Sequence, residues 1–155
     1  MSPRAACRLD ALGFTEVYDY VSGEVDWRAH GLPVEGEEAA APTAARFIRE
    51  GVVTCRLDDR VGEVRERITG SPFGFALVTT PGGVVLGRVR GSALDCDPSL
   101  RAEEVMESGP STVRPDKPAD QLASRLDQRQ LRFGIITTPE GRLLGVVCRE
   151  DLGGA

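Results

Sequence analysis

Residues Thr54–Leu94 read TCRLDDRVGEVRERITGSPFGFALVTTPGGVVLGRVRGSAL, and this stretch occurs a second time in the chain. A shift of 58 positions (112 − 54 = 58) places it over Thr112–Leu152 without a gap. The strongest overlap is TTPGGVVLGRV, residues 79–89, against TTPEGRLLGVV, residues 137–147, where seven of eleven residues are identical. Such identity at one fixed shift indicates an internal repeat, which has to be interpreted before any other feature. The function must therefore be one that two copies of a small unit carry out together.

Each copy has the same predicted order of elements. In the first copy we expect a strand at Val52–Cys55, an amphipathic helix with its apolar face at Val61, Val64 and Ile68, and strands at 75–79 and 84–90. The sequence TPGG between the last two strands suits a tight turn, and TPEG takes its place in the second copy. A short final helix, starting at Ser92 or Glu150, completes a β-α-β-β-α unit. A short lead-in helix precedes each copy, at 44–50 and within 99–110.

The composition limits the class of protein. The chain has 155 residues, of which 41% are hydrophobic and 28% charged, as in a soluble globular protein. No apolar run approaches the ~18 residues that span a membrane, and the N-terminus lacks the apolar core of a signal peptide. The net charge of −5 argues against general nucleic-acid binding, which depends on Lys and Arg at the phosphates. We expect a cytoplasmic protein that binds neither nucleic acid nor a membrane.

The four cysteines do not suggest a metal site. Cys7, Cys55, Cys96 and Cys148 form no CxxC pair, and the chain has one histidine, so we expect no zinc centre. Isolated cysteines in a cytosolic protein are commonly small buried apolar residues, and this is the prediction for all four.

A forty-residue β-α-β-β-α unit exposes too much apolar surface to be stable alone, so the two copies should pack sheet to sheet with a cleft on each side of a pseudo-twofold axis. The element order, the length and the ending LGxVxxxxL, at Leu86–Leu94 and Leu144–Leu152, resemble a tandem pair of CBS domains, often called a Bateman module. The resemblance implies a mixed α/β fold with a linker at 37–44, repeat 1 at 45–97 and repeat 2 at 98–155. It also implies regulation rather than catalysis, a homodimer, and an adenosine-containing ligand: AMP, ADP, ATP or S-adenosylmethionine.

The resemblance also implies a ligand site. In this family a Thr or Ser three residues past the glycine of the last strand, and an Asp three residues later, hold the phosphate and the ribose hydroxyls. In repeat 2 these positions are Cys148 and Asp151, so the carboxylate is present and the hydroxyl is replaced by a thiol, a weaker hydrogen-bond partner. In repeat 1 they are Arg90 and Ala93, and the ribose carboxylate is absent.

The prediction is therefore one adenosyl site at repeat 2. Asp151 would bind the ribose, Thr112 and Val113 would line the adenine end, and Arg90 would supply charge for a phosphate, as Arg88 or Arg149 also could. The full set of predicted ligand-binding residues is Thr112, Val113, Phe133, Cys148, Asp151 and Arg90. The alternative is that Asp151 caps a helix N-terminus and that the arginines form a solvated face.

The first 36 residues are too few to bury a core of their own. We predict a helix at Pro3–Leu12, a strand at Val17–Val21 and a helical turn at Val25–His30, with Trp27 fixing the segment to its neighbour. The stretch RAACRLDALGF…VYDYVSGEVDWRAHGLP resembles the C-terminal part of a rhodanese domain, with landmarks at Gly23, Trp27, Gly31 and Pro33. In that family the catalytic cysteine lies in a loop upstream of the helix, whereas Cys7 lies inside the predicted helix, so no sulfurtransfer by this chain alone is expected.

The main functional prediction is a non-enzymatic regulatory module that senses an adenosine-containing ligand and signals to a partner protein. Two alternatives stay open. One is a ligand-free dimerisation or interaction scaffold, which Cys148 and Ala93 favour, whereas Asp151 favours the sensor. The other is a sulfurtransferase fragment completed by another chain.

Overall fold

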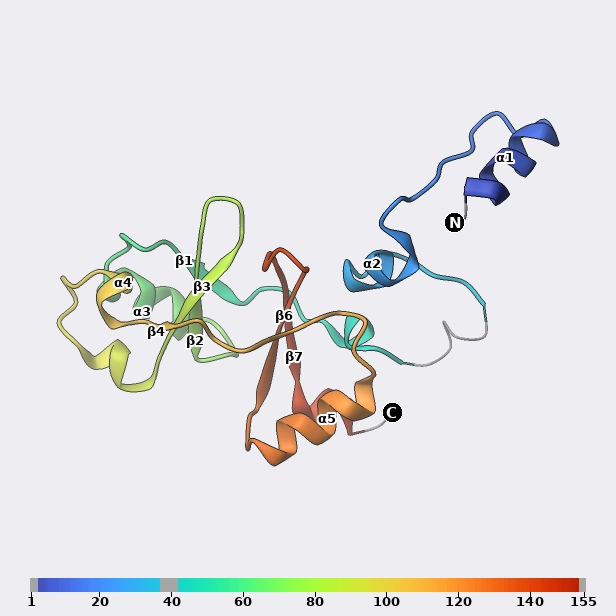
Figure 1. Cartoon of the computed structure of the whole chain (residues 1–155). Coiled ribbons are helices and arrows are strands. Elements are labelled where there is room, and N and C mark those ends of the chain that lie inside the picture. Colours follow the sequence, from blue (N-terminus) through green and yellow to red (C-terminus); the bar gives the residue numbers. More distant parts are fainter. Residues whose placement is uncertain (1–2, 37–41, 154–155) are drawn as a thin grey trace.

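The computed structural model describes residues 3–36 and 42–153, and it shows two α/β units side by side (Figure 1). The first repeat has a four-stranded sheet in the order β1-β2-β3-β4, in which β1 and β2 are parallel and the other pairs antiparallel. The buried side chains Val61, Val64 and Ile68 lie on one face of its helix α3, as the spacing predicted. The elements of this repeat are β1 (Val53–Cys55), α3 (Val61–Thr69), β2 (Phe75–Thr79), β3 (Val85–Arg90) and the 3-10 helix η3 (Gly91–Asp95).

The second repeat has a three-stranded sheet in the order β5-β6-β7, with β5 and β6 parallel and β6 and β7 antiparallel. Helix α5 buries Ala119, Leu122 and Leu126 against this sheet. Ala123 is partly buried beside them. The predicted mixed α/β class and the β-α-β-β-α order are therefore confirmed. The elements are β5 (Thr112–Val113), α5 (Ala119–Gln128), β6 (Phe133–Thr137), β7 (Leu143–Cys148) and α6 (Arg149–Leu152).

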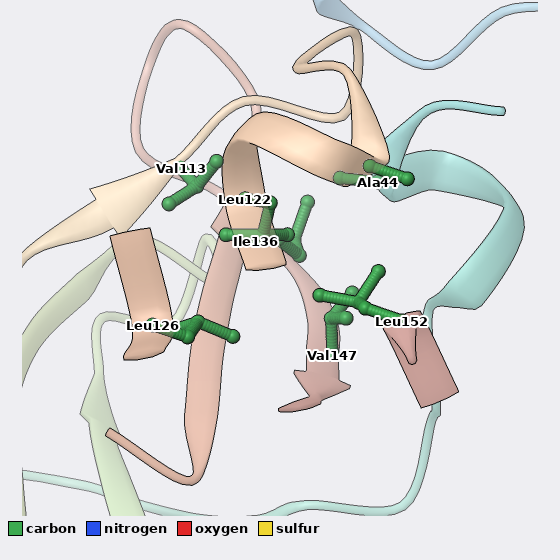
Figure 2. Close-up of a cluster of buried hydrophobic side chains, with 8 residues drawn as sticks. Ala44, Val113, Leu122, Leu126, Ile136, Val147 and Leu152 are labelled. Carbon is green, nitrogen blue, oxygen red and sulfur yellow. The ribbon is translucent and has the colours of Figure 1, made fainter. Parts of the chain in front are cut away.

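The two lead-in segments cross over, and each packs on the opposite repeat. The first contains the 3-10 helix η2 (Ala44–Phe47), shorter than the predicted helix, and its Ala44 is fully buried among the core residues of repeat 2 (Figure 2). The second contains α4 (Ala102–Val105) and β4 (Glu107–Ser108); its Ala102 is fully buried in the core of repeat 1, and β4 pairs with β3. Ala44 and Ala102 are equivalent positions (102 − 44 = 58). Each repeat thus needs the other's lead-in segment to complete its core.

The glycine of the LG ending makes this crossing possible. At Gly145, φ is +148°, and a Cβ atom there would lie 2.6 Å from the carbonyl oxygen of Arg49 and 2.6 Å from Cγ2 of Ile48. Arg49 pairs closely with the same strand, because its N–H donates to the oxygen of Val146 (2.8 Å) and its own oxygen accepts from the Val146 N–H (3.0 Å). A side chain at position 145 would push the lead-in segment off the sheet.

A third apolar cluster lies between the two sheets on the pseudo-twofold axis. Phe75 and Phe133, which are equivalent positions, approach with ring centroids 5.5 Å apart, and Phe73 meets Phe133 edge-on at 5.7 Å. At the hairpin turns the Val85 N–H donates to Gly141 O (3.0 Å) and the Leu143 N–H donates to Gly83 O (2.9 Å). These two hydrogen bonds are related by the same 58-residue shift, so the sequence repeat is also a structural repeat.

The N-terminal segment consists of α1 (Pro3–Ala11) and α2 (Gly23–Ala29), and α1 projects away from both sheets (Figure 1). The predicted strand at 17–21 is wrong, since these residues have no partner strand and form no regular structure. The predicted helical turn at 25–30 is confirmed as part of α2. The Trp27 N–H donates to Pro33 O (2.7 Å) and its ring meets Tyr20 edge-on at 5.2 Å, so these contacts stay within the segment.

Contact with repeat 2 comes instead from the end of α2. Nε2 of His30 lies 3.3 Å from the carboxylate of Glu140 in the hairpin turn, and Gly31 packs against Pro115. Of the predicted linker 37–44, residues 37–41 lie outside the described residues, and the proposed domain boundaries stay a prediction. No helix within the described ranges is long and apolar enough to cross a membrane.

The prediction for the cysteines holds for two of the four. Cys55 and Cys148 are buried, Cys96 is half-buried and Cys7 is exposed on α1. The prediction was wrong for Cys7 because α1 has no neighbouring element to cover it.

Candidate functional site

The predicted carboxylate lies where β7 passes into α6. Asp151 follows Cys148 by three residues, and the Oδ1 atom of Asp151 accepts a hydrogen bond of 2.5 Å from Nη2 of Arg49. The guanidinium is held there because the backbone of Arg49 is paired with β7. The side chain of Asp151 is 23% exposed, so the ion pair lies at the edge of the core rather than free in solvent.

The second oxygen of this carboxylate is unsatisfied. Oδ2 of Asp151 is buried and has no hydrogen-bond partner among the described residues. A buried carboxylate oxygen without a partner costs free energy, so the position is suited to a ligand that donates a hydrogen bond. The hydrogen bond to Asp151 raises the pKa of Arg49, so the arginine stays charged.

Cys148 stands at the last position of β7, paired with Phe133 in the sheet register. Its side chain is buried in the cluster between the sheets, and burial raises the pKa of its thiol. It therefore remains a neutral thiol at neutral pH. Because a thiol is a weak donor and acceptor, Cys148 acts mainly as an apolar wall beside Asp151.

Arg90 and Phe133 lie apart from Asp151 and line a cavity of about 370 Å³ on the pseudo-twofold axis. Its walls come from both repeats. Arg88 and Arg90 both contact the carboxylate of Glu107, at 2.7 Å and 3.1 Å, and the hydrogen bonds from Arg88 and then from Arg90 lower the pKa of Glu107 against the opposing effect of burial. The charge of Arg90 is thus already partly balanced by Glu107.

Thr112 and Val113 lie on β5, which is separated from β7 by β6. Thr112 is exposed, whereas the side chain of Val113 is buried in the core of repeat 2 (Figure 2). Both residues line a second cavity, of about 350 Å³, beside the edge strand β5. Neither Cys148 nor Asp151 borders it.

The structure therefore distributes the six predicted residues over three places. It brings Cys148 and Asp151 together, it puts Arg90 and Phe133 in one cavity, and it leaves Thr112 and Val113 in another. Arg49, the nearest charged partner of Asp151, was missed by the sequence reasoning. It lies five residues before the repeated stretch, and no periodicity in the sequence shows that its segment pairs with the opposite repeat.

A metal centre has no candidate ligands here, since the described residues contain no cluster of three or more His, Cys, Asp or Glu side chains placed to hold an ion.

Comparison with known proteins assigns the fold. Residues 102–153, which include all of the second repeat, match the family model of the CBS domain. No curated protein sequence matches the chain. The matching family model does not reach the N-terminal segment, and the resemblance of that segment to rhodanese stays a prediction.

Solved structures resemble nearly three quarters of the chain. The cytosolic domain of the Mg²⁺ channel MgtE in complex with ATP has a TM-score of 0.64 and 22% identity, over 71% of this chain and 47% of that one. The chain thus covers about half of that protein's length.

Two smaller matches cover nearly all of their own length. A CBS domain protein from Pyrobaculum aerophilum complexed with AMP has a TM-score of 0.62 and 18% identity, over 74% of this chain and 92% of that one. The CBS domain pair of protein MJ0100, in complex with 5′-methylthioadenosine and S-adenosyl-L-methionine, has a TM-score of 0.61 and 14% identity, over 74% and 94%. At these identities the matches show that the fold is that of a CBS-domain pair.

Proposed function

We propose that this chain is a non-enzymatic regulatory module that binds an adenosine-containing ligand, AMP, ADP, ATP or S-adenosylmethionine, beside Asp151. The observation that carries the proposal is the buried, unpartnered Oδ2 atom of Asp151. The hydroxyls of a ribose can donate hydrogen bonds, and an ionised carboxylate is a stronger acceptor for them than a neutral oxygen. The structures with the same fold that hold AMP and S-adenosylmethionine support this ligand class.

The neighbourhood of Asp151 is suited to a ligand with an anionic group. The guanidinium of Arg49 can keep one N–H on Oδ1 and use its remaining N–H groups for a phosphate or carboxylate. Because Arg49 comes from the lead-in segment of repeat 1 and Asp151 from repeat 2, a ligand at this position would contact both repeats. It would thereby favour one packing of the two repeats over another. Through this change of packing, ligand binding would be transmitted to a partner protein.

The test is titration calorimetry and thermal melting with each of the four ligands. We expect the isosteric variant Asp151→Asn to weaken binding at least tenfold, about 1.4 kcal/mol. The matched control is Asp127→Asn, because Asp127 also pairs with an arginine, Arg149, at 3.4 Å but has no buried unpartnered oxygen. Asp127→Asn should leave binding unchanged. If none of the four ligands binds the wild type, the proposed function is wrong.

A ligand-free scaffold is the second candidate, and one observation favours it. Arg49 already donates a hydrogen bond to one of the two carboxylate oxygens of Asp151. The equivalent position in repeat 1 is Ala93, which has no carboxylate. Melting separates the two candidates, since a sensor saturated at about 100 times its Kd gains about 2.7 kcal/mol. A scaffold gains nothing.

We also propose that the N-terminal segment is the docking surface for an effector protein. Every large hydrophobic side chain that is exposed in the described residues lies in this segment: Leu12, Phe14, Tyr18, Val21, Val25, Leu32 and Val34. Residues 9–27 hold five acidic side chains, Asp10, Glu16, Asp19, Glu24 and Asp26, and no basic one. An apolar surface with an excess of acidic groups, of which Glu24 is paired with Arg28 at 2.7 Å, suits a partner whose apolar patch is bordered by Lys and Arg.

This partner proposal has its own test. Val21 and Val25 are 93% and 80% exposed, so Val21→Asp with Val25→Asp should not harm the fold. A protein captured by the wild type would be purified, and its Kd measured with the wild type and with the double variant. We expect at least a tenfold loss, together with weaker binding at higher salt. Equal binding by both chains would contradict the proposal.

The predicted homodimer is likewise a proposal. The acidic charge of residues 9–27 opposes pairing of two copies through that segment, so dimerisation would use the repeats. Light scattering should then give the same dimer mass for the wild type and for the Val21→Asp, Val25→Asp double variant. A wild type that stays monomeric at high concentration would exclude the homodimer.

A further inference from the structure

Two equivalent cavities lie outside the proposed adenosyl site, one at the edge of each sheet. The cavity of repeat 1 is about 580 Å³ and the cavity of repeat 2 about 350 Å³. Five positions related by the 58-residue shift line both of them: Thr54 and Thr112, Cys55 and Val113, Arg56 and Arg114, Asp59 and Lys117, and Arg67 and Arg125. The duplication therefore provides two versions of one site, whose charges can be compared residue by residue.

In repeat 1 a carboxylate of the chain itself balances positive charge in the cavity. The carboxylate of Asp59 forms an ion pair of 2.5 Å with Arg67 and accepts a hydrogen bond from the Arg56 backbone N–H at 3.1 Å. Burial would raise the pKa of Asp59, but the hydrogen bond from Arg67 and that from the Arg56 N–H outweigh it and lower the pKa. Asp59 is therefore ionised, and Arg67 has its counter-charge.

In repeat 2 the charge at the same position is reversed. Position 117, equivalent to 59 (117 − 59 = 58), is Lys117, the only lysine of the chain. Its ammonium donates to Oε1 of Gln121 at 2.5 Å, and Arg125 donates to Oγ of Ser111 at 2.7 Å. Both cations thus hydrogen-bond neutral side chains rather than a carboxylate.

The cavity of repeat 2 is consequently cationic. Arg114, Lys117 and Arg125 line it together with a single acidic residue, Asp116, and none of these four forms an ion pair within the described residues. Lys117 and Arg125 are half-buried, which weakens the screening of their charges by water. Three like charges around one small cavity repel one another until an anion enters it.

We propose that the repeat 2 cavity binds an oxyanion, the phosphate or pyrophosphate group of a small phosphorylated ligand, and that the repeat 1 cavity does not. Guanidinium groups bind phosphate oxygens with pairs of parallel hydrogen bonds, and the Lys117 ammonium adds a point charge. The hydroxyls of Ser111 and Thr112 lie at the same edge and can donate to the remaining oxygens. This site is distinct from Asp151, which does not border the cavity.

The decisive test exchanges the charges of the two equivalent positions. With pyrophosphate as the probe, calorimetry on the wild type should give one site per chain. Lys117→Asp gives repeat 2 the acidic residue of repeat 1, and it should weaken binding at least tenfold. Asp59→Lys gives repeat 1 the cation of repeat 2, and it should raise the stoichiometry to two. Lys117→Met, which removes the charge without adding a new ion pair, serves as the second variant should Lys117→Asp disturb the fold.

A second measurement uses the unique lysine. Mass spectrometry can follow acetylation of Lys117 directly, and bound pyrophosphate should protect it at least fivefold. Protection should persist in Asp151→Asn, so that failure of the adenosyl proposal and failure of this one can be told apart. Wild-type affinity retained in Lys117→Asp, or no protection of Lys117 at saturating pyrophosphate, would overturn the inference.

Discussion

Ala44 and Ala102 occupy equivalent positions of the two repeats, and each is completely buried in the hydrophobic core of the opposite repeat. The exchange explains why the two units are not independent. Each repeat lacks one wall of its own core and obtains it from the segment that precedes the other. We therefore expect the two repeats to unfold together.

The exchange predicts a distant effect of a substitution at Ala44. Ala44→Leu would overfill the core around Leu122 and Leu152, at a cost of about 1–3 kcal/mol. Although position 44 precedes repeat 1, hydrogen exchange should show faster exchange in α5, β6 and β7. Ala11→Leu, on the exposed end of α1, is the control, and it should change neither the stability nor the hydrogen exchange of repeat 2. Faster exchange confined to β1 and α3 would contradict the crossed packing.

Gly145 gives a second stability prediction. Gly145→Ala would place a Cβ atom 2.6 Å from the backbone of Arg49 at a φ that L-residues rarely adopt, and the expected cost is about 1–3 kcal/mol. Gly70→Ala is the control, because position 70 has φ −89° and open space around the glycine. It should be neutral or stabilising by up to about 1 kcal/mol. Denaturant midpoints measure both, and equal midpoints for the two variants would refute the close-approach argument.

Local sequence patterns predicted only part of this structure. The hairpins and the helices α3 and α5 follow from local periodicity and turn chemistry, since Val61, Val64 and Ile68 mark one helical face whatever surrounds it. The crossing of the lead-in segments does not follow from any local pattern. It depends on long-range packing, so the pairing of Arg49 with Asp151 could not be predicted.

The failed strand at 17–21 has a similar cause. The alternation in VYDYV favours an extended conformation, but a strand exists only where a second strand supplies hydrogen bonds. In the described residues that segment has no neighbouring strand, and Tyr18 and Val21 are exposed instead. A sequence pattern can indicate a preference for extended backbone, but a strand forms only where a neighbouring strand is available to pair with it.

Thiol reactivity should follow burial. Burial raises the pKa of Cys55 to about 11, the charge of Asp59 adds to this effect, and burial likewise raises the pKa of Cys148. Since the thiolate is the reactive form, both should resist alkylation by iodoacetamide in the folded protein, whereas the exposed Cys7 should react first. Mass spectrometry of the alkylated peptides gives the order. Modification of Cys55 at the rate of Cys7 in native protein would contradict the packing of β1.

His30 links the N-terminal segment to repeat 2, and its titration reports that contact. Nδ1 of His30 lies 2.8 Å from the carbonyl oxygen of Asp26; this hydrogen bond first, and the charges of Asp26 and Glu140 after it, raise the pKa of His30 above its ordinary value against the opposing effect of desolvation. The stabilisation is therefore complete below the pKa of an unfolded histidine, about 6.5, and it is lost as the pH rises through the higher folded value.

Because His30 is the only histidine of the chain, its imidazole resonances can be assigned without ambiguity. Glu140→Gln should lower the pKa of His30 but leave it above the unfolded value, since the contact with Asp26 remains. Glu150→Gln, an exposed carboxylate beside Arg132, is the matched control and should not move it. A His30 pKa that is the same in the wild type and Glu140→Gln would mean that α2 does not rest on the hairpin turn of repeat 2. The docking surface proposed for residues 12–34 would then move freely relative to the repeats, and ligand binding beside Asp151 could not be transmitted to it through this contact.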